Sequence, residues 1–420
     1  MKSGTTKAYV IGAGVSGLAA ATRLAAEGAS VTLFEAAGQA GGRCRSYFDP
    51  SFDGVIDNGN HLVLSGNHAV HAYLERIGAL VHLAGPVHAQ FDFVDLKSGA
   101  RWTLKPNDGP LPWWMGSAAR RVPGTSPGDY AAFAKLLFAG KRQKVADLVA
   151  CKGALWDRLM HPFLLAVLNT DPGEASARLA GAILRESLAR GGRACRPRIA
   201  TPTLAATFID PALEFLKRSG SDLRFNERMR AITFGGRAAT ALEFPDATLP
   251  LATRDAVILA VPPFVAKDIV PKLSTPGEFR SIVNGHFKFP APDGAPLMLG
   301  VIGGTAEWIF AFADRISVTV SGADAIVDRS REELAATLWA DVCAALNISA
   351  PLPIWQIVKE KRATFAATPA EDAKRPPAKT AWRNFFLAGD WTQTGLPATI
   401  EGAVRSGEAA AALALRHLSL

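Results

Sequence analysis

Residues 7–46, KAYVIGAGVSGLAAATRLAAEGASVTLFEAAGQAGGRCRS, carry the pattern that decides the fold of this chain. The apolar residues 9–11 predict a short buried strand, and the Ala- and Leu-rich residues 16–27 predict a helix that ends in a Gly28 cap. Residues 30–35, SVTLFE, predict a second buried strand. A strand, a helix and a second strand in this order form one βαβ unit of a parallel sheet.

Three glycines lie between the first strand and the helix, in a G-x-G-x-x-G spacing that is typical of dinucleotide binding. Gly12 permits a tight turn, Gly14 lets a pyrophosphate approach the backbone, and Gly17 lets the helix pack closely on the strand. The helix N-terminus offers free N–H groups and the positive end of its dipole to the phosphates. Glu35 ends the second strand, where a carboxylate accepts hydrogen bonds from a ribose diol.

The residues after the second strand favour FAD over NAD as the dinucleotide. Gly41 and Gly42 let the chain pass close to a cofactor, and Arg43 can neutralise phosphate or lie beside a ring system. Arg45 by itself is also consistent with a solvated surface charge. Taken with the glycines, Arg43 indicates a long dinucleotide that passes this loop.

The C-terminal end of the chain predicts a buried strand, a turn and a long helix. The strand, residues 385–388, leads into Gly389 and Asp390, and ligands of open α/β sheets bind at such strand ends. Asp390 either holds a cofactor hydroxyl or a phosphate-bound water, or it is a simple turn aspartate. Pro397 and Thr399 mark the start of the helix.

This helix carries small residues along one side, namely Gly402, Ala403, Gly407 and Ala410. A side of this kind allows close packing against a neighbouring element. The N-terminal N–H groups of the same helix can also face the pyrimidine end of a flavin, where reduction places negative charge. The two interpretations are compatible.

Residues 56–66, IDNGNHLVLSG, place a polar cluster directly before an apolar segment. A polar cluster beside an apolar wall can hydrogen-bond one polar group of an otherwise apolar ligand. Asn60 and His61 are therefore candidate catalytic residues, and histidine, with an ordinary pKa of about 6.5, can donate a proton. The alternative is that His61 is structural and is satisfied by its neighbours.

The composition is that of a globular protein, with 420 residues of which 49% are hydrophobic and 20% charged, enough for two domains. The four cysteines lie far apart and predict neither a disulfide framework nor a zinc site, and no other metal site is indicated. The net charge of +8 is compatible with nucleic acid, with anionic lipid or with solubility alone, but no zinc-finger, RRM-like or basic-helix pattern indicates nucleic acid.

Nothing in the sequence predicts export or a membrane span. The N-terminal residues MKSGTTKAYVIG contain no apolar run of signal-peptide length. No uninterrupted apolar stretch approaches the roughly 20 residues that a spanning helix needs. With unpaired cysteines, these features predict a cytoplasmic protein.

The middle of the chain returns to strands. Residues 221–244 predict alternating strands joined by a Gly-Gly turn, and residues 255–263, DAVILAVPP, predict another buried strand. Residues 161–169, HPFLLAVLN, predict an apolar helix, and residues 370–380, AEDAKRPPAKT, predict a polar linker before the last strand.

One insert has the composition of a membrane-interface segment. Residues 111–121, LPWWMGSAARR, put Trp113 and Trp114 beside Arg120 and Arg121. Tryptophan rings at the acyl boundary with arginines on anionic headgroups form an interfacial anchor. The alternative is that both tryptophans belong to the core.

Several of these motifs together resemble those of a known family. The glycine unit, GGR and AGD…EGAVRSGEAA resemble the flavin-dependent amine oxidase and phytoene desaturase superfamily. Within it, DNGNHLVLSGN, HPFLLAVLNTDPGEASARL, WIFAFADRISVTVSGAD and RPPAKTAWRNFFLAGDWTQTGLPATIEGAVRSG are similar to the hydroxysqualene dehydroxylases, also called squalene-associated FAD-dependent desaturases. Asn60 departs from the family's DNGQH, in which a glutamine stands at this position. Asparagine is one methylene shorter than glutamine.

The resemblance implies an α/β fold with a Rossmann-like FAD-binding domain that is discontinuous in sequence, and an inserted α+β substrate domain of mixed sheet and helices. The FAD domain would cover residues 1–75, 205–265 and 380–420, and the substrate domain residues 76–204 and 266–379. Met229 would contact the adenine through its backbone. The expected FAD-binding residues are Gly12, Gly14, Gly17, Glu35, Ala36, Gly42, Arg43, Met229, Gly389, Asp390, Pro397, Thr399 and Ile400.

The activity that the resemblance implies is reduction of hydroxysqualene to squalene in a bacterial hopanoid pathway, with hydride from reduced FAD. A phytoene or carotenoid desaturase would use FAD oxidatively, and no aromatic pair typical of an amine oxidase is recognisable near the C-terminal motif. A non-enzymatic prenyl-lipid carrier shares the fold, but the intact glycines favour bound flavin. The expected partners are a long-chain isoprenoid lipid, the anionic inner face of the cell membrane as a peripheral site, and an unidentified electron donor.

Overall fold

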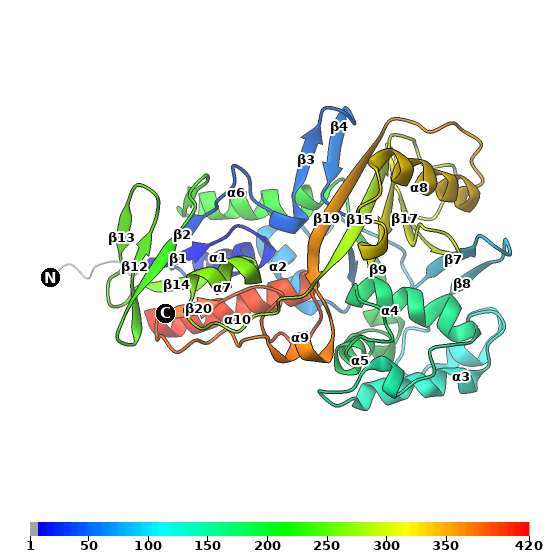
Figure 1. The fold of residues 1–420 in the computed structure, drawn as a ribbon, viewed down its shortest axis with the longest axis horizontal. Coiled ribbons are helices and arrows are strands. Elements are labelled where there is room, and N and C mark those ends of the chain that lie inside the picture. Colours follow the sequence, from blue (N-terminus) through cyan, green and yellow to red (C-terminus); the bar gives the residue numbers. More distant parts are fainter. Residues whose placement is uncertain (1–6, 420) are drawn as a thin grey trace.

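Three distant parts of the chain supply the strands of one parallel sheet, which carries the glycine-rich motif (Figure 1). The computed structural model describes residues 7–419, so residues 1–6, on which the expectations about export and the start of the FAD domain partly rest, lie outside it. The strands are β1 (Lys7–Ile11), β2 (Ser30–Phe34), β10 (Asp222–Arg224), β14 (Ala256–Leu259) and β20 (Phe385–Leu387). Their order is β10-β2-β1-β14-β20, with every neighbouring pair parallel. The predicted α/β, Rossmann-like and discontinuous fold is confirmed.

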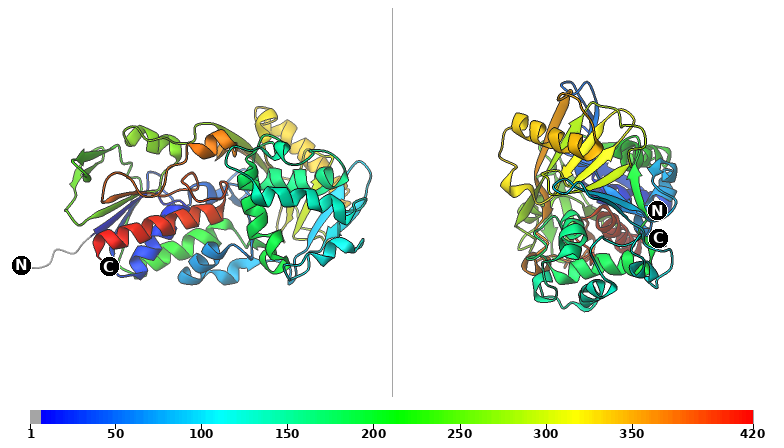
Figure 2. Two further views of the ribbon diagram at one scale, coloured as in Figure 1. Left: turned by 90° about the horizontal axis from the view of Figure 1, so that it is seen from below. Right: turned by 90° about the vertical axis from the view of Figure 1, so that its right-hand side faces the viewer.

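Helices surround this sheet, and the longest of them packs against the first. The helices are α1 (Val15–Ala26), α2 (His68–Ile77), α6 (Asp210–Arg218), α7 (Pro263–Ile269) and α10 (Ile400–Leu418). Figure 2 shows α10 running alongside the elements of the N-terminal unit. The contact between α10 and α1 requires small residues, because a Cβ atom at Gly407 would lie 2.2 Å from the carbonyl oxygen of Ser16. The small side of α10 therefore serves close packing.

A second, mixed sheet of seven strands forms the other end of the molecule, in the order β19-β15-β18-β17-β16-β7-β8. The strands are β7 (Phe91–Asp95), β8 (Arg101–Leu104), β15 (Phe279–Phe287), β16 (Met298–Ile302), β17 (Trp308–Ala311), β18 (Ile316–Val320) and β19 (Trp355–Phe365). Side chains alternate between the two faces of this sheet. Ile309 belongs to the hydrophobic cluster that includes α8 (Arg331–Leu346), whereas Trp308 and Phe310 belong to the hydrophobic cluster that includes residues of α4 and α5.

The helices α3 (Pro127–Ala131), α4 (His161–Leu168) and α5 (Ala177–Glu186) lie at the same end of the molecule as this sheet (Figures 1 and 2). α4 occupies the predicted apolar stretch and is preceded by a π-helical turn, Trp156–Met160. The remaining elements are the hairpin β3 (Ser46–Asp49) and β4 (Gly54–Asp57), the strands β5 (Leu62–Leu64), β6 (Leu83–Ala84) and β9 (Pro197–Ala200), the strands β11 (Ala231–Gly235), β12 (Ala238–Glu243) and β13 (Thr248–Pro250), and α9 (Pro369–Ala373).

One sequence prediction is wrong, and another pair of alternatives is decided residue by residue. Residues 370–380 are not a polar linker, because α9 covers the first part of them, as far as Ala373, and Asp372 and Arg375 are buried. Trp114 is core and packs against Tyr130, whereas Trp113 is exposed. Within residues 7–419, none of the helices has the length and apolar character that crossing a bilayer demands.

Candidate active site

The glycine-rich turn between β1 and α1 is closed on one side and open on the other. Gly12 has a φ of +106°, and a Cβ atom there would lie 2.5 Å from the carbonyl oxygen of Ala260. A Cβ atom at Gly17 would lie 1.9 Å from the carbonyl oxygen of Gly12. At Gly14, by contrast, a Cβ atom would meet no described protein atom within 4 Å. The open side of the turn is therefore at Gly14, where α1 begins without a side-chain cap on its N–H groups.

The GGR loop lies directly against this turn. Gly41 has a φ of +112° and donates its N–H to the carbonyl oxygen of Ala13 over 2.8 Å. A Cβ atom at Gly42 would lie 3.6 Å from the Cα of Gly14, so the two glycine segments are neighbours. The sequence placed both segments at the cofactor, and the structure brings them together.

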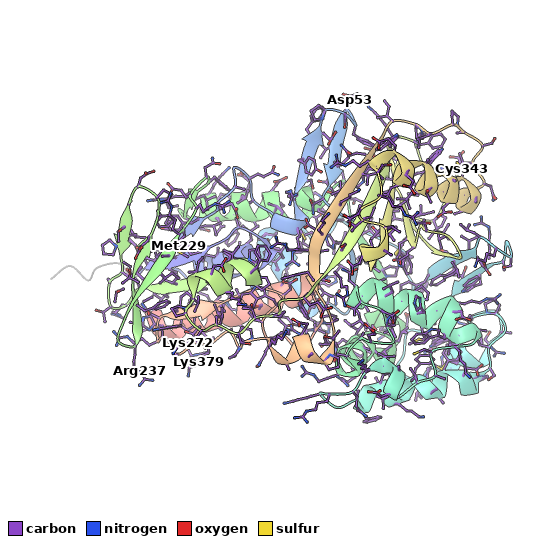
Figure 3. The ribbon with its side chains drawn as sticks, viewed as in Figure 1. Asp53, Met229, Arg237, Lys272, Cys343 and Lys379 are labelled. Atoms are coloured by element: carbon purple, nitrogen blue, oxygen red, sulfur yellow. The ribbon has the colours of Figure 1, made fainter. Side chains whose placement is uncertain are left out.

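Glu35 lies at the carboxyl end of β2 and is held by the backbone. Its carboxylate accepts hydrogen bonds from the N–H groups of Ala13 at 2.8 Å and Ala37 at 2.9 Å. The chain before Met229 reaches the same place, since the N–H of Glu227 donates to the carbonyl oxygen of Glu35 over 2.9 Å. Met229 is buried beside the parallel sheet, at the opposite end of the molecule from Cys343 on α8 (Figure 3). Ala36, next to Glu35, is exposed.

We expect Glu35→Ala to weaken FAD binding by about 1–3 kcal/mol, because the ribose hydroxyls lose a charged acceptor. Glu35→Gln keeps one acceptor oxygen and should lose less. The measurement is a titration of apoprotein with FAD, with Glu214→Ala on the exposed side of α6 as the control. Full flavin occupancy of Glu35→Ala at low FAD concentration would contradict the assignment.

Arg43 connects the GGR loop to the C-terminal motif. Its guanidinium donates to the Asp390 carboxylate over 2.8 Å and to the carbonyl oxygen of Ala363 over 2.6 Å. The side chain is 41% exposed, and partial desolvation of its guanidinium by itself would lower the pKa of Arg43, but the Asp390 carboxylate outweighs this effect and the pKa is raised. Asp390 is thus more than a turn residue. Its carboxylate holds the permanently charged guanidinium of Arg43 beside the two glycine segments.

The turn before Asp390 and the start of α10 have well-defined backbone contacts. Gly389 has a φ of +146° and donates its N–H to the Ser406 hydroxyl over 2.9 Å. Thr399 is the N-cap of α10 and accepts from the N–H of Gly402 over 3.0 Å. Pro397 precedes this cap and Ile400 opens the helix, as the sequence predicts for the start of a helix.

A buried arginine that the sequence did not point to supports this loop. Arg375, only 2% exposed, donates to the carbonyl oxygens of Asp390 at 2.9 Å and Leu396 at 2.8 Å. It also donates to the Thr394 hydroxyl at 2.7 Å and to Asp372 at 3.1 Å. Arg375 therefore ties both ends of the loop that links β20 to α10.

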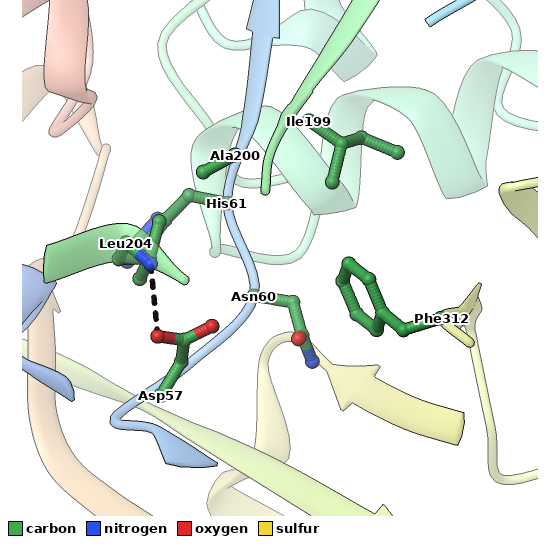
Figure 4. A pocket seen from close by; sticks show the side chains of 7 residues that line it. All are labelled: Asp57, Asn60, His61, Ile199, Ala200, Leu204 and Phe312. Carbon is green, nitrogen blue, oxygen red and sulfur yellow. Dashed lines mark hydrogen bonds between the residues drawn. The ribbon is translucent and has the colours of Figure 1, made fainter. Parts of the chain in front are cut away.

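The polar cluster of residues 57–61 lines a small pocket with apolar walls. The lining residues are Asp57, Asn60, His61, Ile199, Ala200, Leu204 and Phe312 (Figure 4). The chain from β4 to β5 supplies the three polar side chains, while β9 and the loop after β17 supply Ile199 and Phe312. The structure therefore brings Asn60 and His61 together, with apolar side chains on the other walls.

Burial changes the acid–base chemistry of this pocket. It lowers the pKa of His61 to about 4, and the positive charge of Arg43 contributes in the same direction. His61 is therefore neutral near pH 7, and its ring can donate one hydrogen bond and accept another. Burial raises the pKa of Asp57, although a hydrogen bond from the Ser46 hydroxyl opposes this effect.

A larger cavity shares one lining residue, Ile199, with the small pocket. It has a volume of about 700 Å³, and its walls combine apolar side chains such as Phe93 and Met298 with the polar side chains of Asp92 and Arg101. A volume in this range is typical of sites for small organic ligands.

The arrangement fits a dinucleotide with a flavin ring. The open side at Gly14 and the uncapped start of α1 suit a pyrophosphate, and Glu35 suits a ribose. Arg43, paired with Asp390, follows the second glycine segment directly and is close enough to His61 to lower its pKa, so its charge lies near the place where a redox ring would meet its substrate. Arg375, which the sequence did not predict, supports the loop that carries Asp390.

Comparison with known proteins agrees with this geometry. Residues 15–415 match the model of the flavin containing amine oxidoreductase family. The hydroxysqualene dehydroxylase of Rhodopseudomonas palustris is 54% identical over 97% of this chain and 98% of that protein, and the one of Sinorhizobium fredii is 50% identical over 97% and 98%.

Solved structures agree on the fold. Cyclohexylamine oxidase from Brevibacterium oxydans has a TM-score of 0.71 at 16% identity over 98% of this chain and 99% of that one. A putrescine oxidase double mutant has a TM-score of 0.71 at 17% identity over 98% and 99%. The chain is an FAD-dependent oxidoreductase that belongs to the flavin containing amine oxidoreductase family and, within it, to the hydroxysqualene dehydroxylases.

Proposed function

We propose that this enzyme removes the hydroxyl group of hydroxysqualene to give squalene. The observation that carries the proposal is the pocket in which Asp57, Asn60 and His61 face apolar walls and which shares Ile199 with the larger cavity. A hydrocarbon with a single hydroxyl matches such a pocket, and two relatives that are half identical to this chain or more carry the name of this activity. Squalene would in turn feed a hopanoid pathway.

The chemistry balances with reduced FAD as the reductant. When bound and reduced, FAD supplies a hydride and a proton, so that the alcohol becomes a hydrocarbon and its oxygen leaves as water. Asn60 and the neutral His61 would orient the hydroxyl by hydrogen bonding. Leu204 and Phe312 would keep other water from the carbon that loses its hydroxyl. Arg43, held by Asp390, would keep a positive charge near the ring system.

The test is anaerobic mixing of the reduced holoenzyme with hydroxysqualene. We expect flavin oxidation together with an equal amount of squalene. Squalene formation without flavin oxidation would overturn the hydride mechanism, and no squalene at all would overturn the substrate. Phytoene serves as the comparison, because new conjugated absorbance would identify a desaturase, and protein that purifies without flavin absorbance would support a lipid carrier.

We also propose that the enzyme takes its substrate from the cytoplasmic face of an anionic membrane. Trp113 is 61% exposed, and Arg120 stacks over its ring at 4.6 Å. Leu111, two residues before Trp113, is exposed as well. An exposed indole and leucine beside an arginine suit the interface between acyl chains and anionic headgroups. Trp114 takes no part, since it is buried.

We expect Trp113→Ala to reduce co-sedimentation with anionic liposomes about fivefold or more, because insertion of an indole contributes on the order of 1–2 kcal/mol. High salt should reduce the remaining binding further, because salt screens the attraction between anionic lipid and basic residues, each of which contributes about 1 kcal/mol near the surface. Phe48→Ala on the β3–β4 hairpin is the matched control, because Phe48 is 60% exposed. Binding that is indifferent to both lipid charge and Trp113→Ala would place the membrane contact elsewhere.

A further inference from the structure

A chain of hydrogen bonds leaves the backbone next to Asn60 and returns to its side chain. Asn284 on β15 accepts from the N–H of Asn60 at 3.4 Å and donates its Nδ2 to the carbonyl oxygen of Asn58 at 3.4 Å. The Thr319 hydroxyl on β18 donates to Asn284 Oδ1 over 2.8 Å, and Asn60 Nδ2 donates to Thr319 Oγ1 over 3.1 Å. The seven-stranded sheet thus holds the amide of Asn60.

The direction of every bond in this chain follows from the backbone. The carbonyl oxygen of Asn58 can only accept and the N–H of Asn60 can only donate, so together they determine which end of the Asn284 amide faces each of them. Asn284 Oδ1 then accepts from Thr319, whose hydroxyl hydrogen is used in that bond. Thr319 Oγ1 is left with lone pairs, and it accepts from Asn60 Nδ2.

The Asn60 carbonyl oxygen is the atom that this chain leaves over. Its partner in the bond to Thr319 is Nδ2, and within residues 7–419 the structure gives Oδ1 no donor, while Asn60 lines the small pocket (Figure 4). We propose that Asn284 and Thr319 are positioning residues that turn the carbonyl oxygen of Asn60 toward the substrate hydroxyl. This inference rests on the proposed function.

The polarity of Asn60 determines which leaving group the pocket favours. When the C–O bond breaks, its electron pair goes to oxygen, the oxygen takes the proton that reduced FAD brings, and hydride goes to carbon. The departing water has two O–H donors, so an acceptor such as a carbonyl oxygen stabilises it as positive charge develops on oxygen. An amide N–H in the same place would instead stabilise departing hydroxide. The hydrogen-bond chain through Asn284 and Thr319, called the relay below, therefore favours loss of water over loss of hydroxide.

The first test compares two ligands of the same carbon skeleton on oxidised holoenzyme. Hydroxysqualene can donate and accept a hydrogen bond, whereas the corresponding ketone can only accept. We expect the alcohol to bind at least about tenfold more tightly, because the ketone leaves the Asn60 oxygen unpaired. Flavin absorbance changes on titration report both dissociation constants without turnover. Equal or tighter binding of the ketone would overturn the proposal.

The second test changes the relay. Thr319→Val removes the hydroxyl, so the preference for the alcohol should fall toward onefold and kcat should fall about tenfold or more, while Thr319→Ser should restore both. Thr364→Val is the matched control, because Thr364 is also 9% exposed, bonds an asparagine (Asn169) at 2.9 Å and lies outside the pocket. If Thr319→Val behaves like the control, the relay has no role. Wild-type enzyme that forms no squalene would instead contradict the proposed function alone, since the ligand comparison needs no turnover.

Discussion

Gly14→Ala should weaken FAD binding strongly and leave the fold intact, whereas Gly17→Ala should disrupt both. An alanine Cβ at position 14 meets no described protein atom within 4 Å, and the backbone there, with φ −71° and ψ 173°, is extended. The protein itself can therefore accommodate the methyl group. The same side of the turn is where a pyrophosphate approaches the backbone, so we expect a loss of affinity on the order of 100-fold or more, about 3 kcal/mol.

At Gly17 the obstacle is the protein. A Cβ atom 1.9 Å from the carbonyl oxygen of Gly12 cannot be accommodated without moving α1 away from β1. Overpacking of this kind costs about 1–3 kcal/mol or more, and it also distorts the phosphate turn.

Denaturant unfolding of the apoproteins and FAD titration separate the two effects. Gly277→Ala is the control, because a Cβ atom there also meets no described atom within 4 Å and its φ is not positive. If Gly14→Ala binds FAD like the wild type, the open side of the turn is not the phosphate site. If Gly17→Ala is as stable as the wild type, the close packing of α1 on β1 is not required.

The parts of the site that the sequence predicted are those whose chemistry is local. Gly12, Gly14 and Gly17 must occur at these spacings because one turn has to meet three steric demands at once. Glu35 could be placed because a strand of known length leads to it from the helix. In such segments the neighbours that matter are close in sequence, so a pattern of residues reports the structure directly.

The parts that could not be predicted depend on contacts between distant segments. Thr319 and Asn284 bond Asn60 across 259 and 224 positions of the chain, and no spacing rule links them. The pKa of His61, lowered to about 4, depends mainly on burial, which residue type does not reveal. Trp113 and Trp114 are adjacent and identical, yet one is exposed and the other is core.

Arg375 is a further residue whose burial the composition of its segment did not predict. The stretch around it is rich in charged residues and prolines, a composition that is typical of a solvated linker. Its guanidinium is nevertheless buried, because three acceptors on the loop after β20 and the carboxylate of Asp372 together bond its two terminal nitrogens. Burial lowers the pKa of Arg375, and Asp372 opposes that shift. Composition describes which groups carry charge, whereas burial depends on whether partners for that charge arrive from elsewhere.

Arg375→Met should therefore lower the free energy of unfolding by about 3–5 kcal/mol, the usual cost of breaking a buried charged network by removing one partner. It removes the arginine donor from the carbonyl oxygen of Asp390 and leaves that of Leu396 with only the Thr394 hydroxyl, so the loop that presents Asp390 to Arg43 loses its support. FAD affinity should fall as well, and Arg375→Lys should recover only part of both losses, because an ammonium cannot reach all the acceptors of a planar guanidinium.

Arg178→Met is the control for Arg375→Met. Both arginines bond Asp372, but only Arg375 also bonds the loop. Arg178 bonds the other oxygen of Asp372 at 2.5 Å, but its side chain is partly exposed and it makes no described contact with the loop. Its loss should cost about 1 kcal/mol or less and leave FAD affinity unchanged. Denaturant midpoints and FAD titrations of the three variants decide the matter. If Arg375→Met and Arg178→Met weaken FAD binding equally, the effect passes through Asp372 and α9 rather than through the carbonyl oxygens of the loop, and Arg375 does not position Asp390.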